Sequence, residues 1–296
     1  MMSTRQNLLI SALLVVVLFL FNLNCEEKVT TSRERTDWEA IKNIIYENPD
    51  IFLVDVFDTF KNTSVKPIFY REITSTYFDL EEGIAIDPPN PSYPEEHVFA
   101  PWEDSIKGVL HYFIGEEKYT KTFQAYSLMN AFFERLGDIY DEHRGWRLRR
   151  ISGNVIKSIK PSSRLLHTVR ITSSELDTVL NEIRILNPVK FSRWRPTLDS
   201  TLSFGMGEAV TFTVWPKDTT DYLYLHFGED GNFRKLPFKS NGDGTFSRIC
   251  TTTTDPDIAE GYKHAFVEAI SHAALTDTAA QYDSKAWGII YRIKQE

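Results

Sequence analysis

The chain has 296 residues, and its 41 acidic side chains outnumber its 33 basic ones, which gives a formal net charge of −8. A chain this acidic argues against nucleic acid as a partner and against electrostatic attraction to anionic lipid. Aromatic residues make up 13% of the sequence, enough apolar area for the cores of two domains of ordinary size.

The first feature along the chain is an apolar run over residues 8–21 that ends shortly before Cys25. Arg5 is the only charged side chain ahead of that cysteine. A membrane-spanning helix needs about 20 apolar residues, and this run is shorter. It has the length expected for the apolar core of a secretion signal, roughly 7–15 residues. We therefore predict a signal peptide over residues 1–24.

The junction Leu23-Asn24-Cys25-Glu26 resembles a bacterial lipoprotein signal, although Asn24 stands where Gly, Ala or Ser is usual. The resemblance implies that Cys25 carries lipid, that it becomes the mature N-terminus, and that the protein is held at a membrane of the cell envelope. Glu26 in place of Asp favours the outer membrane, on its periplasmic or surface face. An ordinary secretion signal or an uncleaved anchor, with Cys25 unmodified, is the alternative. If Cys25 is lipidated, Cys250 has no disulfide partner.

Residues 25–35 are charged and nearly free of apolar side chains, as expected of a lipidated cysteine followed by a tether. Asp37 then begins a predicted helix, in which Trp38, Ile41 and Ile44 follow at helical spacing. A second short helix is expected over residues 51–60.

Strands are predicted over residues 68–78, 105–114 and 145–153, with a proline-rich connection over residues 87–101. The run 120–136 fits either a helix or a long buried strand. A helix followed by long antiparallel strands and the run Gly145-Trp146-x-Leu148-x-x-Ile151-Ser152-Gly153 resembles the NTF2-like, or SnoaL-like, family.

That resemblance covers residues 36–158 and implies an α+β cone, in which a bent antiparallel sheet wraps a helix around a cavity. The candidates for lining this cavity are Tyr70, Trp102, His111, Tyr112 and Trp146. No catalytic residue of the family can be carried over to them, because no motif matches residue by residue.

Residues 159–166 contain Pro161, Ser162 and Ser163 and follow Ser158, and they are predicted to form a linker. Two extended runs follow at 167–172 and 182–186. Strands are then expected over residues 209–215, 222–227, 245–250, 261–270 and 287–293, with a turn at Asn241-Gly242-Asp243-Gly244. This pattern resembles an immunoglobulin-like β-sandwich over residues 167–296, without the paired cysteines of true immunoglobulin domains.

Motifs for chemistry are missing from the sequence. The seven histidines form no His-Glu-x-x-His pattern, and Gly-x-Ser-x-Gly does not occur. The loop from Asn241 has Thr252 where a calcium-binding EF-hand needs Glu. We therefore expect no metal, no cofactor and no catalytic residue. Trp146 and Trp287, each beside a glycine in a strand-like run, are expected to be buried.

Two classes of function remain. The first is a non-enzymatic envelope lipoprotein that binds a protein, a glycan or a small molecule. The second is a cavity enzyme of the isomerase or dehydratase type, acting on a small apolar substrate. An interior plugged by its own aromatic side chains favours the first class, and an open pocket with an Asp/His pair at its base favours the second.

Overall fold

The computed structural model describes residues 34–48, 52, 65–79, 86–87, 95–160, 165–186, 189–190, 202–228, 234–259 and 262–294. The predicted signal peptide, Cys25 and almost all of the predicted helix 51–60 lie outside these residues. None of the helices in the described ranges is long and apolar enough to cross a bilayer.

The predicted first helix is confirmed as α2 (Asp37–Tyr46). Its N-cap is Thr36, whose hydroxyl accepts from the backbone N–H of Glu39 while the Glu39 carboxylate accepts from the Thr36 N–H. This reciprocal pair satisfies two backbone donors that the first turn would otherwise leave open. Ala40, Ile41, Ile44 and Ile45 form the buried face, so burial adds to the stability that the cap provides.

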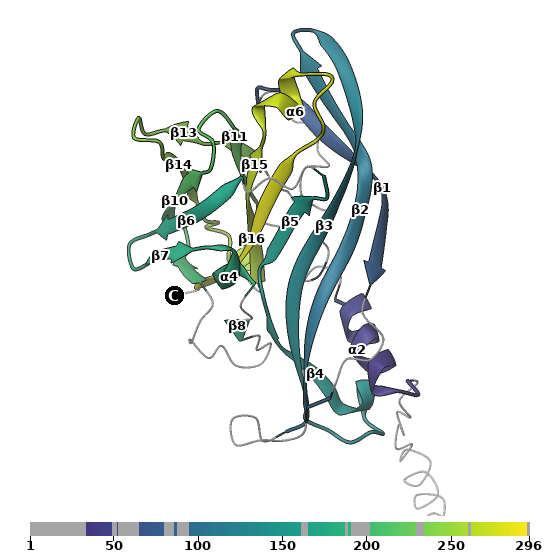
Figure 1. Ribbon diagram of the computed structural model, residues 1–296. Helices are drawn as coiled ribbons and strands as arrows, with labels where there is room; N and C mark the ends of the chain where they lie inside the picture. The colour runs from purple at the N-terminus through teal and green to yellow at the C-terminus, as the bar shows by residue number, and fades with distance from the viewer. Residues whose placement is uncertain are drawn as a thin grey trace, which may run out of the picture.

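Most of the chain forms one large sheet, whose strands pair almost entirely antiparallel (Figure 1). Its order is β1 (Phe69–Asp79), β2 (His97–Ile114), β3 (Glu117–Arg135), β5 (Asn154–Ser158), β16 (Ser284–Lys294), β15 (Tyr262–Ile270), β11 (Tyr222–Phe227) and β12 (Arg234–Pro237). Three further strands extend it: β4 (Trp146–Ile151) pairs with β3, β8 (Val189–Lys190) with β4, and β9 (Leu202–Gly205) runs parallel to β16.

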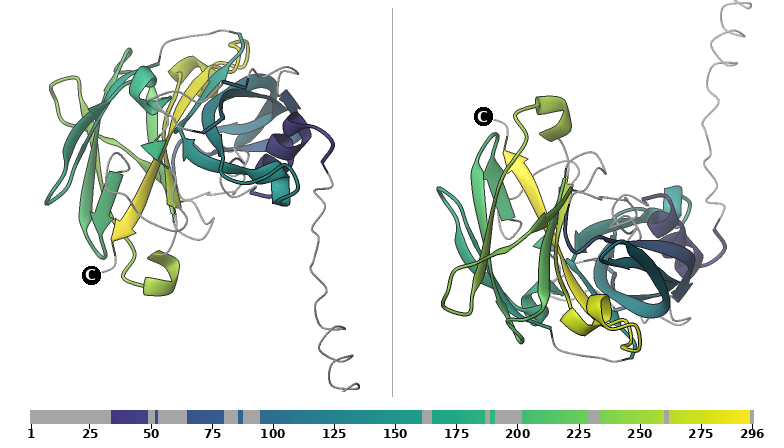
Figure 2. Two further views of the ribbon diagram at one scale, coloured as in Figure 1. Left: turned by 90° about the horizontal axis from the view of Figure 1, so that it is seen from below. Right: turned by 90° about the horizontal axis from the view of Figure 1, so that it is seen from above.

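This sheet curls until its first and last strands meet. Lys235 of β12 donates from Nζ to the backbone oxygen of Phe69 in β1, at 2.7 Å. Gly108 permits the bend, because a Cβ there would lie 2.5 Å from the Glu72 carbonyl oxygen, beside a register shift in β1. In Figure 2, β1–β3 curl round at one side of the molecule.

A second sheet covers the other side, in the order β13 (Lys239–Ser240), β14 (Phe246–Thr251), β10 (Ala209–Pro216), β6 (Leu166–Thr172) and β7 (Asp177–Leu180). Its apolar face packs on β11, β15 and β16, where Phe212 and Val214 share a core with Trp287. Cys250 is buried in this core, where its thiol lies 3.6 Å from the Val210 carbonyl oxygen. Short helical segments complete the fold: η1 (Glu142–Gly145), α4 (Glu182–Ile185), α5 (Pro256–Ala259) and α6 (His272–Thr276).

The expected fold class, an α+β cone with N-terminal helices followed by an immunoglobulin-like sandwich, is wrong. The described residues form a mostly β structure, with one curled antiparallel sheet and a second sheet packed on it. The C-terminal strands β16, β15, β11 and β12 continue the sheet that the N-terminal strands begin. The curled sheet therefore encloses side chains of its own strands, while α2 packs against the end of the curl formed by β2, β3 and β4.

Individual strands were predicted better than their assembly. The predicted runs at 68–78, 145–153, 209–215, 222–227, 245–250, 261–270 and 287–293 correspond to β1, β4, β10, β11, β14, β15 and β16. The ambiguous run 120–136 is strand β3. The extended run expected at 182–186 is wrong, because Asn181 caps helix α4 by accepting from the Arg184 N–H. The domain limits stay a prediction, but the sheet itself crosses the expected linker through the β5–β16 pairing.

Candidate functional site

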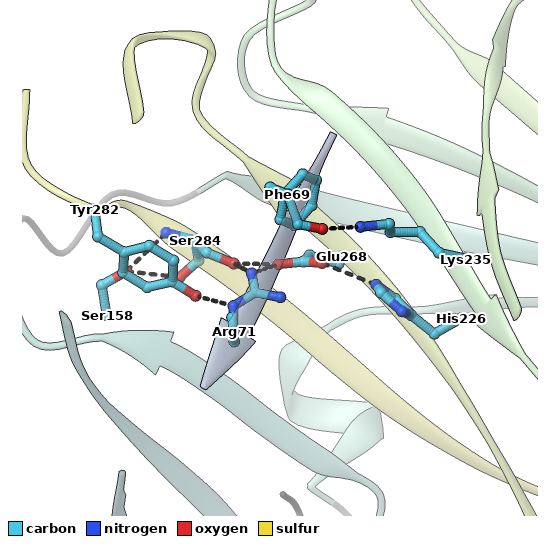
Figure 3. Close-up of polar contacts among 8 residues, drawn as sticks. All are labelled: Phe69, Arg71, Ser158, His226, Lys235, Glu268, Tyr282 and Ser284. Atoms are coloured by element: carbon cyan, nitrogen blue, oxygen red, sulfur yellow. Dashed lines mark hydrogen bonds and ion pairs between the residues drawn. The ribbon is translucent and has the colours of Figure 1, made fainter. Parts of the chain in front are cut away.

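Inside the curled sheet, polar side chains from both halves of the chain converge. We define the buried polar cluster as Arg71, Ser158, His226, Lys235, Glu268, Tyr282 and Ser284, shown in Figure 3. Successive strand residues point to opposite faces, so Arg71 of β1 and Glu268 of β15 share the interior face with Phe69 and Phe266. Every member of the cluster is at most 6% exposed.

Glu268 lies at the centre of the cluster. Its Oε2 lies 2.8 Å from Nε2 of His226, and its Oε1 accepts from Ser284 Oγ at 2.7 Å and from the Arg71 guanidinium. Burial alone would raise the pKa of Glu268. The charge of Arg71 and the hydrogen bonds from His226 and Ser284 outweigh that effect and hold the pKa well below its usual range. The carboxylate is therefore ionised throughout the physiological pH range.

Tyr282 and Arg71 form the second part of the cluster. Arg71 donates from Nε to the Tyr282 hydroxyl oxygen at 2.9 Å, and its guanidinium lies 5.4 Å from the centre of the Tyr282 ring. Burial raises the pKa of Tyr282, so the phenol is neutral. The Tyr282 ring in turn packs on Phe123 of β3, with centroids 4.6 Å apart.

The remaining contacts join strands to one another. Ser158 of β5 donates to the backbone oxygen of Ser284 at 2.9 Å and accepts from the Ser284 N–H at 2.7 Å. Lys235 lies 3.6 Å from the centre of the Phe69 ring as well as donating to the Phe69 carbonyl. The cluster thereby joins β1, β5, β11, β12, β15 and β16.

In many acid–base sites a carboxylate orients a histidine, which then acts as the base toward a nucleophile. Here the Ser284 hydroxyl donates to Glu268 and not to His226, so no nucleophile–base pair forms among these residues. The surrounding positions are filled by aromatic rings, those of Phe69, Phe123, Tyr224 and Phe266. The arrangement holds strands together, because Glu268 of β15 contacts Arg71 of β1 and His226 of β11, and Lys235 of β12 binds the backbone of β1.

Sequence reasoning missed this cluster because its two oppositely charged residues, Arg71 and Glu268, lie 197 positions apart. One signal was present. Glu268 stands inside the otherwise apolar run of β15, and an ionised side chain there must find a buried partner.

Three of the five predicted lining residues are core residues. Trp102 stacks on Phe52 with centroids 5.2 Å apart, and Trp146 donates from Nε1 to Asp37 Oδ1 at 3.1 Å. Both belong to the core that packs against α2. Tyr112 is 1% exposed and lies in the core inside the curl, with Lys121 Nζ 4.5 Å from its ring centre.

The other two, Tyr70 and His111, lie side by side on the outer face of the β1–β2 pair. Their rings stack with centroids 4.6 Å apart. Glu72 Oε2 lies 3.0 Å from His111 Nε2, and Lys118 donates to the Tyr70 hydroxyl at 3.0 Å. We call Tyr70, Glu72, His111 and Lys118 the outer cluster. The structure therefore brings Tyr70 and His111 together but does not bring the five residues around one cavity.

A second polar group lies where α2 meets η1. Asp37 is paired with Arg135 and Arg144 and accepts from Trp146. Burial would raise the pKa of Asp37, but these donors outweigh it and lower the pKa. His143 lies between Glu34 and Glu47, at 3.1 Å from each. His143 and Arg144 both have φ of 52°, a left-handed backbone that these contacts stabilise.

Within the described ranges, no three His, Cys, Asp or Glu side chains come close enough to hold a metal ion. Comparison of the sequence with protein-family models and with curated proteins finds no match to either.

Proposed function

We propose that the protein is a lipid-anchored protein of the bacterial cell envelope, and that it acts as a non-enzymatic binding or interaction module for a protein, glycan or small-molecule partner. The anchor rests on the predicted signal over residues 1–24 and on Cys25, which follows it. The outer membrane is the preferred location, because Glu26 follows the cysteine.

The observation that carries the binding role is the filled interior of the curled sheet. The aromatic rings of Phe69, Phe123 and Tyr282 occupy it, and in the buried polar cluster Tyr282 and Ser284 are hydrogen-bonded to Arg71 and Glu268. The NTF2-like cone on which the isomerase or dehydratase alternative depended is not the fold that these residues adopt.

Recognition is then expected on the outside of the sheet. The outer cluster presents a stacked Tyr70–His111 pair between an acidic and a basic side chain, and Glu72 is 66% exposed at the side chain. Aromatic rings beside charged groups can contact sugar rings and peptide side chains alike. This surface is where we place the binding role.

Lipid attachment is tested by metabolic labelling with a fatty acid. The wild type and the Cys250→Ser variant should incorporate label equally, because Cys250 is buried far along the chain. Cys25→Ser should incorporate none. Equal labelling of Cys25→Ser and the wild type would refute the anchor.

Binding is tested by a thermal-shift screen of envelope glycans and peptides against the chain without residues 1–24. A ligand that binds only the native state raises the apparent stability. A ligand of the outer cluster should lose its shift in Tyr70→Ala and keep it in Ile249→Ala, where the residue truncated is an exposed apolar side chain on the second sheet. A shift that survives Tyr70→Ala but is lost in Ser284→Ala would place the binding site inside the curl and contradict the proposal.

A further inference from the structure

Exposed apolar side chains gather in the loop that joins β3 to η1. Leu136 is 52% exposed, Ile139 39% and Tyr140 68%. We call these three residues the loop patch. Three large apolar side chains exposed within five consecutive positions are unusual on a protein surface, where exposed apolar residues normally occur singly.

The loop that carries the patch is well ordered by its own hydrogen bonds. Leu136 donates from its N–H to the Gly145 carbonyl at 2.9 Å, which closes the loop at its base. Asp141 Oδ2 accepts from the Asp138 N–H at 2.7 Å, and Asp138 Oδ1 accepts from the Tyr140 N–H at 3.2 Å. The two carboxylates thus bind backbone within the loop, while the apolar side chains project away from it.

The N-terminal segment enters the structure beside this loop. Glu34, the first described residue, binds His143 of η1 and accepts from Asn43 of α2, both at 3.1 Å. Figure 1 shows α2 at the end of the molecule opposite to α6 and to the turn between β2 and β3. The attachment point of the predicted tether and the loop patch therefore share one end of the fold.

The length of the tether brings this end close to the bilayer. Residues 26–33 separate Cys25 from Glu34, and a fully extended chain between these two residues spans at most about 30 Å. Strand β2, with 18 residues, has a contour length of up to about 60 Å. The tether is thus too short to bring the far turn of the β2–β3 hairpin easily to the bilayer surface. It is long enough to let the loop patch reach that surface.

We propose that the loop patch docks on the phospholipid bilayer that holds the Cys25 lipid, with Leu136, Ile139 and Tyr140 in the headgroup region. Tyrosine favours that interface, where its ring is in contact with acyl chains and its hydroxyl with water, and leucine and isoleucine add apolar insertion. Because the chain is acidic, docking occurs by apolar insertion and needs no anionic lipid. The proposal rests on the proposed lipid anchor, and it places the outer cluster, which lies beside the β2–β3 turn, near the end of the molecule that is farthest from the bilayer.

The test uses the full chain, lipidated and reconstituted in phosphatidylcholine vesicles. A polarity-sensitive fluorophore is attached to Ile139→Cys in a Cys250→Ser background, and the matched control carries it on Ile249→Cys, which is 62% exposed on the second sheet. The label at 139 should shift to shorter wavelength and be quenched by spin-labelled lipids. The label at 249 should show neither effect. Equal, water-like emission at both positions would overturn the proposal.

Anchoring and docking are read separately. Flotation with the vesicles reports whether the lipid anchor is present. Loss of flotation would therefore contradict the proposed lipid attachment at Cys25 and would not bear on docking of the loop patch. A Leu136→Ser, Tyr140→Ser variant should still float but lose most of the quenching at 139. The chain beginning at Glu26 provides the last comparison: if its label at 139 is protected without vesicles, and more so at higher protein concentration, the patch is an interface between copies and the docking proposal is wrong.

Discussion

At the scale of single residues, the structure is organised by ionisable side chains that are buried and paired. Glu268 and Arg71 are the clearest example, since each is almost fully removed from water and the two side chains form an ion pair. Such a pair adds little net stability compared with a well-packed apolar pair, but removing one partner leaves the other as an uncompensated buried charge.

Glu268→Gln should therefore destabilise the protein by about 3–5 kcal/mol, because it removes the carboxylate charge with which the buried Arg71 forms its ion pair. The matched control is Glu175→Gln, which removes an exposed ion pair with Lys294 and should cost less than about 1 kcal/mol. Chemical denaturation measures both. Similar small losses in the two variants would show that Glu268 is solvated in solution.

The pKa of Asp221 is shifted in the opposite direction from that of Glu268. Burial, together with the charges of Asp218 and Asp283, raises the pKa of Asp221 to about 6. Among the described residues its Oδ2 has no hydrogen-bond partner. The folded state therefore keeps a proton that the unfolded state has already released, so stability falls as the pH rises from about 4 to about 6, and the penalty persists above that range.

Asp221→Asn removes this penalty. The variant should be more stable than the wild type at neutral pH. The difference should shrink as the pH falls and vanish below about pH 3, where the wild-type carboxyl is protonated in both states. Thermal unfolding across this range measures the difference. A constant difference at all pH values would mean that Asp221 titrates normally.

At the scale of elements, the alternation of apolar and polar residues in the sequence was sufficient to find most strands. It does so because successive side chains of a strand point to opposite faces. It failed where both faces are buried. In β3, Phe123 and Met129 point into the curl while Phe132 is covered on the outer face, where Arg150 lies 5.0 Å from its ring centre. Apolar residues on both faces erase the period of two, which is why residues 120–136 fitted a helix equally well.

The candidate site was less predictable for a related reason. Burial of Trp102, Tyr112 and Trp146 follows from their size and their strand context. The meeting of Arg71 with Glu268, or of Tyr70 with His111, depends on register and curl, which are set by contacts between distant strands and by the bend at Gly108. No local pattern contains that information.

Substitution of Trp146 tests how β4 is held against α2. Its indole is fully buried between β4 and α2, donates to Asp37 and lies 4.8 Å from the Arg135 guanidinium. Truncation of Trp146 to Ala should cost about 3–5 kcal/mol through the cavity that it leaves. Trp146→Phe keeps most of the volume and should cost clearly less. Equal losses in the two variants would assign the effect to the hydrogen bond with Asp37 and not to packing.

At the scale of the whole molecule, one sheet passes through both halves of the chain. The β5–β16 pairing, the Ser158–Ser284 bonds and the Arg71–Glu268 ion pair all cross the region where the sequence predicted a linker. A molecule joined in this way is expected to unfold as one unit, with its interior closed and its recognition surfaces outside.

Native-state hydrogen exchange is the most direct measurement of that central claim. The amides of Tyr70 in β1, His226 in β11 and Glu268 in β15 lie in paired strands. They should exchange with one common free energy of opening, equal to that of global unfolding measured with denaturant. Such agreement would show that the interior opens only when the whole molecule unfolds. Exchange at Tyr70 with a much smaller free energy than at Glu268 would show that the β1–β3 curl opens independently, and would contradict the account.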